Sequence, residues 1–117
     1  MAVLNALYGA TRIGTSKLTD GHIYYACDVY PIGSKVFGVN AVYAFVSGSG
    51  PFPVKYIGKA DVLSERLEGH ERLSEARLLG ADQLWVHIPH EVDRIRHEEA
   101  ERRLIQFLKP PMNTHYK

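Results

Sequence analysis

Val54-Lys55-Tyr56-Ile57-Gly58-Lys59-Ala60-Asp61 is the segment of this 117-residue chain that decides the fold. Its first four residues favour a β-strand, and Gly58 is expected to end that strand. From Val62 to about Leu79, apolar residues recur with the spacing of an amphipathic helix. Asp61 is expected to cap this helix, because its carboxylate can accept hydrogen bonds from the free N–H groups of the first turn.

Two polar residues interrupt the apolar stripe of this helix. Arg66 and His70 lie one turn apart and fall between Val62 and Leu67 around the helix axis, whereas the glutamates of the segment fall on the opposite face. A cation on the core-facing side of a helix is costly unless an anion meets it. The stripe therefore indicates that an anionic group approaches this helix.

A second amphipathic helix is expected from about Glu91 to Leu108, where Lys109-Pro110-Pro111 ends it. Most of its charged residues fall on one solvated face. Glu101 does not, because at ~100° per residue it falls between Leu108 and Ile105 on the apolar stripe. A carboxylate on the core-facing side is the second anomaly of the sequence.

The rest of the chain is read mainly as strands and loops. Four segments favour strands: Ile23–Tyr30, Lys35–Val39, Ala41–Val46 and Gln83–Ile88. The first two would form a hairpin, and the third would pair antiparallel with the strand that begins at Val54. Residues 1–21 read as a loop or mobile arm, with a short helix over Met1–Tyr8 as an alternative.

Composition sets broad limits. The chain is 45% hydrophobic and 23% charged, which is typical of one compact domain with a core of its own. The single cysteine, Cys27, cannot form an internal disulfide and favours a reducing, cytoplasmic compartment, and it shows no zinc-ligand spacing with the six histidines. No apolar run reaches the roughly 20 residues of a membrane span. The net charge of +1 neither requires nor excludes a nucleic-acid partner.

The inward-facing charged residues allow two interpretations. One is a buried ion pair between Arg66 and Glu101, with Tyr43 and Tyr56 as core aromatics on neighbouring strands. The other is a phosphodiester site, in which Glu101 holds a hard divalent cation and Arg66 binds the phosphate through both arms of its guanidinium. A tyrosine or a metal-bound water would then act on the nucleophile.

An ordered set of short motifs runs through the last 75 residues or so. They are Val42-Tyr43-Ala44, Tyr56-Ile57-Gly58, Arg66, His70, Glu101 with Leu104-Ile105, Pro110 and Asn113. The set resembles the GIY-YIG nuclease family, and Lys59 also matches a lysine of its excision-repair branch. Two features depart from the family pattern: the first tripeptide keeps only its tyrosine, and the loop between the two tyrosines is somewhat long.

The resemblance implies an α+β fold in which a small antiparallel sheet of three core strands is flanked by helices. Residues 41–117 would form the nuclease domain, and residues 1–40 would be an N-terminal extension, either a hairpin or an arm. One face of the domain would carry the catalytic residues, which are Tyr43, Tyr56, Arg66, His70 and Glu101.

The resemblance also implies metal-dependent hydrolysis of DNA phosphodiester bonds, in DNA repair or recombination. Glu101 would be the single protein ligand of Mg²⁺ or Mn²⁺, with water completing the shell. Tyr43 would be the general base, directly or through water, although His70 could serve instead. Arg66 would stabilise charge on the phosphoryl oxygens, and Tyr56 and His70 would position the phosphate or water.

Lys59 and Asn113 complete the expected site as substrate-binding residues. Of the two, Asn113 is expected to act mainly as a structural anchor at the edge of the site. DNA would be the substrate, and a partner protein or a homodimer could supply targeting. The alternative is a catalytically retired scaffold that binds nucleic acid or docks a partner. The altered first tripeptide favours this alternative, whereas the intact Arg66, His70 and Glu101 speak against it, because unused inward charges cost stability.

Overall fold

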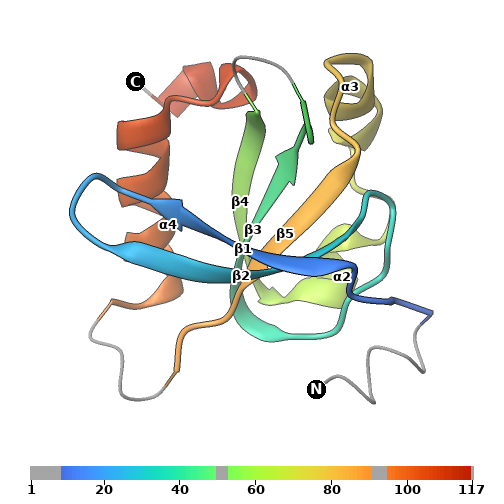
Figure 1. Cartoon of the computed structure of the whole chain (residues 1–117), viewed down its shortest axis with the longest axis horizontal. Coiled ribbons are helices and arrows are strands. Elements are labelled where there is room, and N and C mark those ends of the chain that lie inside the picture. The colour runs from blue at the N-terminus through green and yellow to red at the C-terminus, as the bar shows by residue number, and fades with distance from the viewer. Residues whose placement is uncertain (1–8, 50–52, 91–94, 117) are drawn as a thin grey trace.

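Five antiparallel strands form one sheet in the computed structural model, which describes residues 9–49, 53–90 and 95–116 (Figure 1). The strands are β1 (Gly14–Thr19), β2 (Tyr24–Pro31), β3 (Val39–Val46), β4 (Val54–Val62) and β5 (Gln83–His87). They lie in the order β1-β2-β5-β3-β4, so β4 is an edge strand. The helices are α2 (Leu63–Leu67), α3 (Leu73–Leu78) and α4 (His97–Leu108), followed by the 3₁₀ segment η1 (Pro111–Tyr116). The expected α+β class with an antiparallel sheet is confirmed.

The sheet is wider than the expected three strands. β1 and β2 form a hairpin, and β2 pairs with β5, so this N-terminal part of the chain belongs to the main sheet. Residues 35–38, expected to form the second strand of a hairpin, instead lie in the connection between β2 and β3. β1 contains a single buried apolar residue, Leu18, and it therefore has no alternating pattern to reveal it in the sequence. The helix suggested for Met1–Tyr8 lies outside the described residues.

Gly58 lies in the middle of β4 and not at its end. It pairs with Tyr43 across the β3–β4 ladder, and a Cβ atom at this position would lie 2.5 Å from Cζ and Oη of that tyrosine. Glycine is therefore needed here so that the ring can approach the backbone closely. β4 continues to Val62, which makes Asp61 a strand residue. The expected Asp61 cap is wrong, since α2 has Val62 as its N-cap and no side-chain cap.

The helix expected from Val62 to Leu79 is interrupted. α2 and α3 replace it, and the residues between them include Gly69, whose φ of +60° is a left-handed conformation that suits glycine. The interruption turns His70 inward, where only 7% of its surface is exposed. α4 ends at Leu108 as expected but begins at His97, and residues 91–94 lie outside the described part of the chain.

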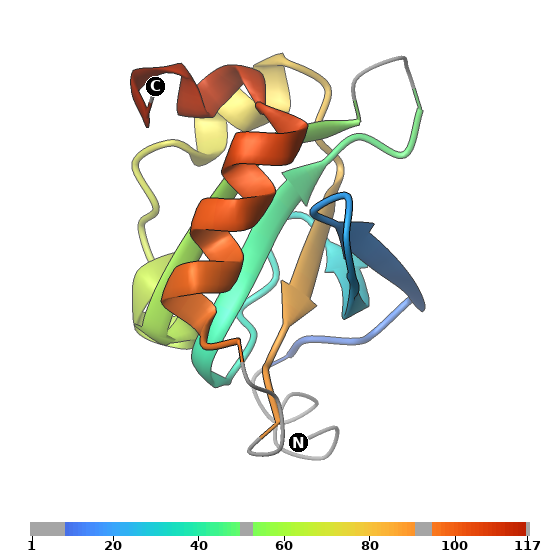
Figure 2. The same cartoon turned by 90° about the vertical axis from the view of Figure 1, so that its left-hand side faces the viewer.

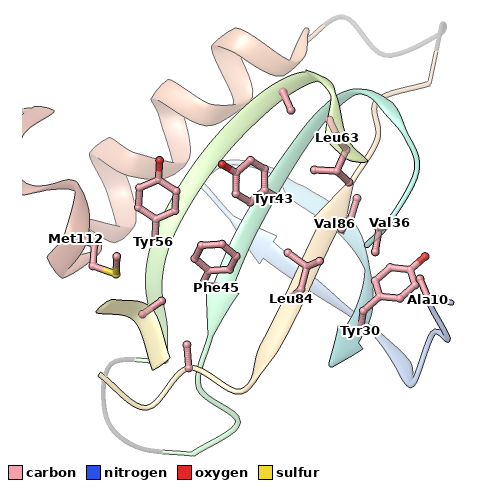
Figure 3. Close-up of a cluster of buried hydrophobic side chains, with 14 residues drawn as sticks. Ala10, Tyr30, Val36, Tyr43, Phe45, Tyr56, Leu63, Leu84, Val86 and Met112 are labelled. Carbon is pink, nitrogen blue, oxygen red and sulfur yellow. The ribbon is translucent and has the colours of Figure 1, made fainter. Parts of the chain in front are cut away.

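Different helices cover the two faces of the sheet (Figure 2). Val42 and Ala44 of β3 pack with Ala100 and Leu104 of α4 on one face. Tyr43 points to the opposite face, because successive side chains of a strand alternate. Figure 3 shows the cluster on that second face, which includes Tyr43, Phe45, Tyr56, Leu63, Leu84 and Met112. None of the helices in the described ranges is long and apolar enough to cross a membrane.

A side chain from η1 satisfies the free backbone groups at the centre of the edge strand β4. The Asn113 side chain accepts a hydrogen bond from the Ile57 N–H (2.9 Å) and donates one to the Ile57 carbonyl (3.0 Å). Asn113 is 3% exposed, so this amide takes the place that a sixth strand would occupy at Ile57. The contact holds the C-terminal segment against the strand that carries Tyr56.

Candidate active site

Two tyrosines on neighbouring strands form the centre of the candidate site. Tyr43 of β3 and Tyr56 of β4 lie side by side with their ring centroids 6.2 Å apart (Figure 3). Tyr56 is 7% exposed, whereas Tyr43 is fully buried. The Tyr43 hydroxyl lies 2.8 Å from Nε2 of His70, which comes from the connection between α2 and α3.

The hydrogen bonds of His70 define its tautomer. Nδ1 accepts a hydrogen bond from the backbone N–H of Arg72 at 3.1 Å, so the neutral ring carries its proton on Nε2. That N–H then donates to the Tyr43 oxygen and leaves the Tyr43 proton free to point elsewhere. Burial, followed by the charges of Arg66 and Arg72, lowers the pKa of His70 to about 4, so the ring is neutral at pH 7.

The electrostatic environment of Tyr43 favours its protonated form. Burial raises the pKa of the phenol above its usual value, and the neighbouring Tyr56 and Glu101 raise it further. Arg66 acts in the opposite direction, because a nearby positive charge stabilises the phenolate. Arg66 and Glu101 thus both lie within electrostatic range of the same hydroxyl group.

Arg66 is half-buried on α2, with 35% of its side chain exposed. Its guanidinium lies 3.6 Å from the Glu71 carboxylate and also interacts with the Tyr56 hydroxyl. The suggested ion pair between Arg66 and Glu101 is therefore wrong, since Glu71, expected on the solvated face, is the carboxylate that pairs with Arg66. The exposed part of the guanidinium can meet an anion from solvent.

Glu101 of α4 is half-buried at the edge strand. Burial raises the pKa of its carboxyl group, against the effect of Lys59 and His97. Among the residues that the structure describes, no side chain forms an ion pair or hydrogen bond with this carboxylate. The carboxylate is thus neither sealed in the core nor turned fully to solvent.

The fit of this site to Mg²⁺ or Mn²⁺ depends on that carboxylate. Within the described ranges there is no group of three or more histidine, cysteine, aspartate or glutamate side chains that could hold a metal ion. Mg²⁺ nevertheless binds proteins through one or two carboxylates and keeps several waters. Glu101, whose oxygens accept no hydrogen bond from the described side chains, fits that mode of binding.

The two candidate substrate-binding residues differ in placement. Lys59 is exposed on β4, on the strand face that meets α4, and its charge reaches Glu101. Asn113 is buried, and both of its polar side-chain atoms bind the backbone of Ile57. Asn113 therefore acts as a structural anchor, and Lys59 is the residue of this pair that a substrate can reach.

Sequence reasoning missed Arg72. Besides its backbone bond to His70, its guanidinium donates to the Met112 carbonyl at 2.9 Å and lies 5.5 Å from the centre of the Tyr56 ring. A continuous helix would have placed Arg72 on the solvated face, and the glycine at position 69 was the one sign of a break. Phe45 was missed as well, although it stacks on Tyr56 and contacts His70.

The candidate site draws on five residues from different segments. They are Tyr43 from β3, Tyr56 from β4, Arg66 from α2, His70 from the α2–α3 connection and Glu101 from α4. The α+β protein thus carries two phenols, an imidazole and a guanidinium on the sheet face that α2 covers, and a carboxylate on α4, which packs against the opposite face. No family model matches the chain, and no curated protein and no solved structure matches it.

Neutral His70 makes the stability of the fold depend on pH. The folded pKa of about 4 lies below the usual value of 6.5, so the unfolded chain binds more protons between these values. Stability should therefore fall as the pH drops through this window, by up to about 3 kcal/mol from this residue. Urea unfolding at pH 7 and pH 4.5 should show a smaller loss in His70→Gln than in the wild type. An equal loss in both proteins would contradict the neutral ring, and His22→Gln, at an exposed histidine, is the control.

Proposed function

We propose that the protein is a GIY-YIG-type endonuclease that hydrolyses DNA phosphodiester bonds with Mg²⁺ or Mn²⁺. The observations that support this proposal are the contacts that join Tyr43, Tyr56, Arg66 and His70, together with the position of Glu101 within electrostatic range of Tyr43. These groups provide the three elements that phosphodiester hydrolysis needs: a cation for the phosphate, a group near the nucleophile and a ligand for a divalent metal.

Arg66 is proposed to bind the scissile phosphate. Its planar guanidinium stays charged at all relevant pH values and matches two phosphate oxygens at once. The present partner is the exposed Glu71, and a pair of this kind contributes little stability. A phosphate can therefore replace Glu71, and the same contact would strengthen as negative charge develops in the transition state.

Tyr43 is the better of the two candidates for the general base. His70 has its Nδ1 lone pair occupied and its proton on Nε2, so it serves to hold the Tyr43 hydroxyl in place. Tyr43 must lose its proton to act as a base, and Arg66 is the positive charge that opposes the increase in its pKa caused by burial. Tyr43 is buried, so the side chains that cover its hydroxyl must move when substrate binds for it to contact the nucleophile.

Glu101 would hold the divalent cation. A divalent cation held by this carboxylate would supply positive charge that lowers the cost of the negative charge developing on the phosphate. Lys59 lies on the face of β4 that meets α4, near Glu101. It would contact a neighbouring phosphate of the DNA backbone. Tyr56 interacts with Arg66 and would keep the guanidinium oriented towards the substrate.

The test is cleavage of supercoiled plasmid and of forked, flapped and four-way DNA, each with Mg²⁺, with Mn²⁺ or with EDTA. The wild type should cut at least one substrate only when a metal is present. Arg66→Ala should cut about 100-fold more slowly, because one transition-state contact is lost. Arg77→Ala, which removes an exposed arginine of α3, is the matched control and should cut normally.

Two results would contradict the proposal. If Arg66→Ala cuts as well as the wild type, the assignment of the site is wrong. If no substrate is cut under any condition while DNA still binds, the retired-scaffold alternative replaces the nuclease. A panel of RNA substrates run in parallel distinguishes a DNA nuclease from one that acts on RNA.

A further inference from the structure

His97 is a buried histidine that has no part in the proposed reaction. It is the first residue of α4 and is 4% exposed. Its Nε2 atom lies 3.0 Å from Oδ1 of Asp61 on β4, and its Nδ1 atom lies 3.2 Å from Oε1 of Glu98. The side chain of His97 therefore joins the start of α4 to the end of the edge strand.

This contact lies one helical turn from Glu101. Residues four apart share one face of a helix, separated by about 6 Å along its axis. Residues two apart on a strand point to the same side, separated by roughly 6.7 Å. The pairs His97 with Asp61 and Glu101 with Lys59 follow both spacings, so β4 and α4 face each other in register at the site.

Within the described ranges, the contact with Asp61 is the side-chain hydrogen bond that ties the N-terminus of α4 to the sheet. The N-cap residue Arg96 makes no side-chain hydrogen bond to the first turn. Helix ends without such partners leave N–H groups unsatisfied and tend to fray. Glu101 is in the second turn, so movement of the first turn would move its carboxylate relative to Tyr43.

We propose that His97 is a positioning residue, whose hydrogen bond to Asp61 fixes the first turn of α4 on β4 and thereby places the Glu101 carboxylate for a divalent cation. This inference rests on the proposed function, since it takes Glu101 as the ligand. His97 itself does not bind the cation, because Asp61 occupies the ring nitrogen that faces β4.

The experiment measures Mn²⁺ binding without DNA, by electron paramagnetic resonance of free Mn²⁺. His97→Ala and Asp61→Ala should each weaken binding about 10-fold, the lower end of the effect known for residues that orient metal ligands. The double variant should be no weaker than either single variant, because both remove one interaction. His97→Gln, whose amide can still donate to Asp61, should recover part of the affinity.

Leu104→Val is the control for a purely structural effect, because it weakens the packing of α4 without touching the His97 contact. Its Mn²⁺ affinity should equal that of the wild type, and weaker binding in this variant would overturn the inference. Unchanged affinity in both alanine variants would do the same. Weaker binding in His97→Ala alone would also overturn it, because His97 would then be a ligand.

Mn²⁺ binding and DNA cleavage by the wild type show whether this inference or the proposed function has failed. If the wild type binds Mn²⁺ but cuts no DNA, only the proposed nuclease activity is contradicted. The Mn²⁺ affinities of the variants would still decide whether His97 is a positioning residue. A wild type that binds no Mn²⁺ would overturn the cation site, and with it both proposals.

Discussion

Replacement of Glu101 by glutamine should lower the rate of Mg²⁺-dependent DNA cleavage by about 1000-fold or more while the protein stays folded. The amide has no charge and is a poor ligand for a hard cation, so the metal contribution to transition-state stabilisation is lost. Thermal stability at pH 7 should equal or exceed that of the wild type. Burial raises the pKa of Glu101, which means that the folded state penalises the charged carboxylate, and the neutral amide escapes this penalty.

Single-turnover cleavage of labelled DNA and thermal unfolding measure the two parts of this prediction. Glu99→Gln, on the same helix, removes a carboxylate that pairs with Arg102 and Arg103 and should leave the cleavage rate unchanged. A Glu101→Gln variant that is less stable but still cuts DNA would show that this glutamate has a structural role. The gain in stability should shrink as the pH falls towards the range in which the carboxyl group becomes protonated.

Replacement of Asn113 by alanine should lower the free energy of unfolding by about 3 kcal/mol. The change leaves the N–H and the carbonyl of Ile57 without partners in a buried position, and each lost partner costs roughly 1–3 kcal/mol. The melting temperature should fall by more than about 10 °C in a domain of this size. Urea unfolding gives the free energy directly.

Gln106→Ala, at an exposed position of α4, is the control for Asn113→Ala and should change stability by less than about 0.5 kcal/mol. A loss below 1 kcal/mol in Asn113→Ala would contradict the anchor role. In that case the sequence-based prediction that Asn113 binds substrate would be tested by the DNA affinity of the variant.

Elements with clear periodicity were predicted well from the sequence. β5 alternates buried and half-buried residues from Gln83 to His87, and its predicted range was one residue too long. The C-terminal end of α4 at Leu108 was predicted correctly, because two prolines follow closely. In both cases a local pattern agrees with the tertiary structure.

Other elements depend on contacts that no local pattern reveals. β1 has a single buried side chain, Leu18, and is a strand because β2 pairs with it. β4 passes through Gly58, since a ring from β3 needs the space and the ladder continues beyond it. The break at Gly69 was overlooked because the apolar residues on either side fit one helical period.

The candidate site was partly predictable for a physical reason. Arg66, His70 and Glu101 stood out as polar residues on apolar stripes, and such residues turn towards a shared interior. Their partners were not predictable, because ion pairs depend on the backbone path. Arg66 pairs with Glu71 instead of Glu101, and Asp61 binds His97 instead of capping a helix.

The burial of Tyr43 has a consequence for how sequences of this kind are compared. The ring fills the core above Gly58, so a lineage that no longer needs cleavage would still retain an aromatic residue at position 43 to stay folded. Arg66 and Glu101 are only half-buried and would drift first under relaxed selection. Retention of these two residues together is thus a better diagnostic of an active enzyme than retention of the tyrosine.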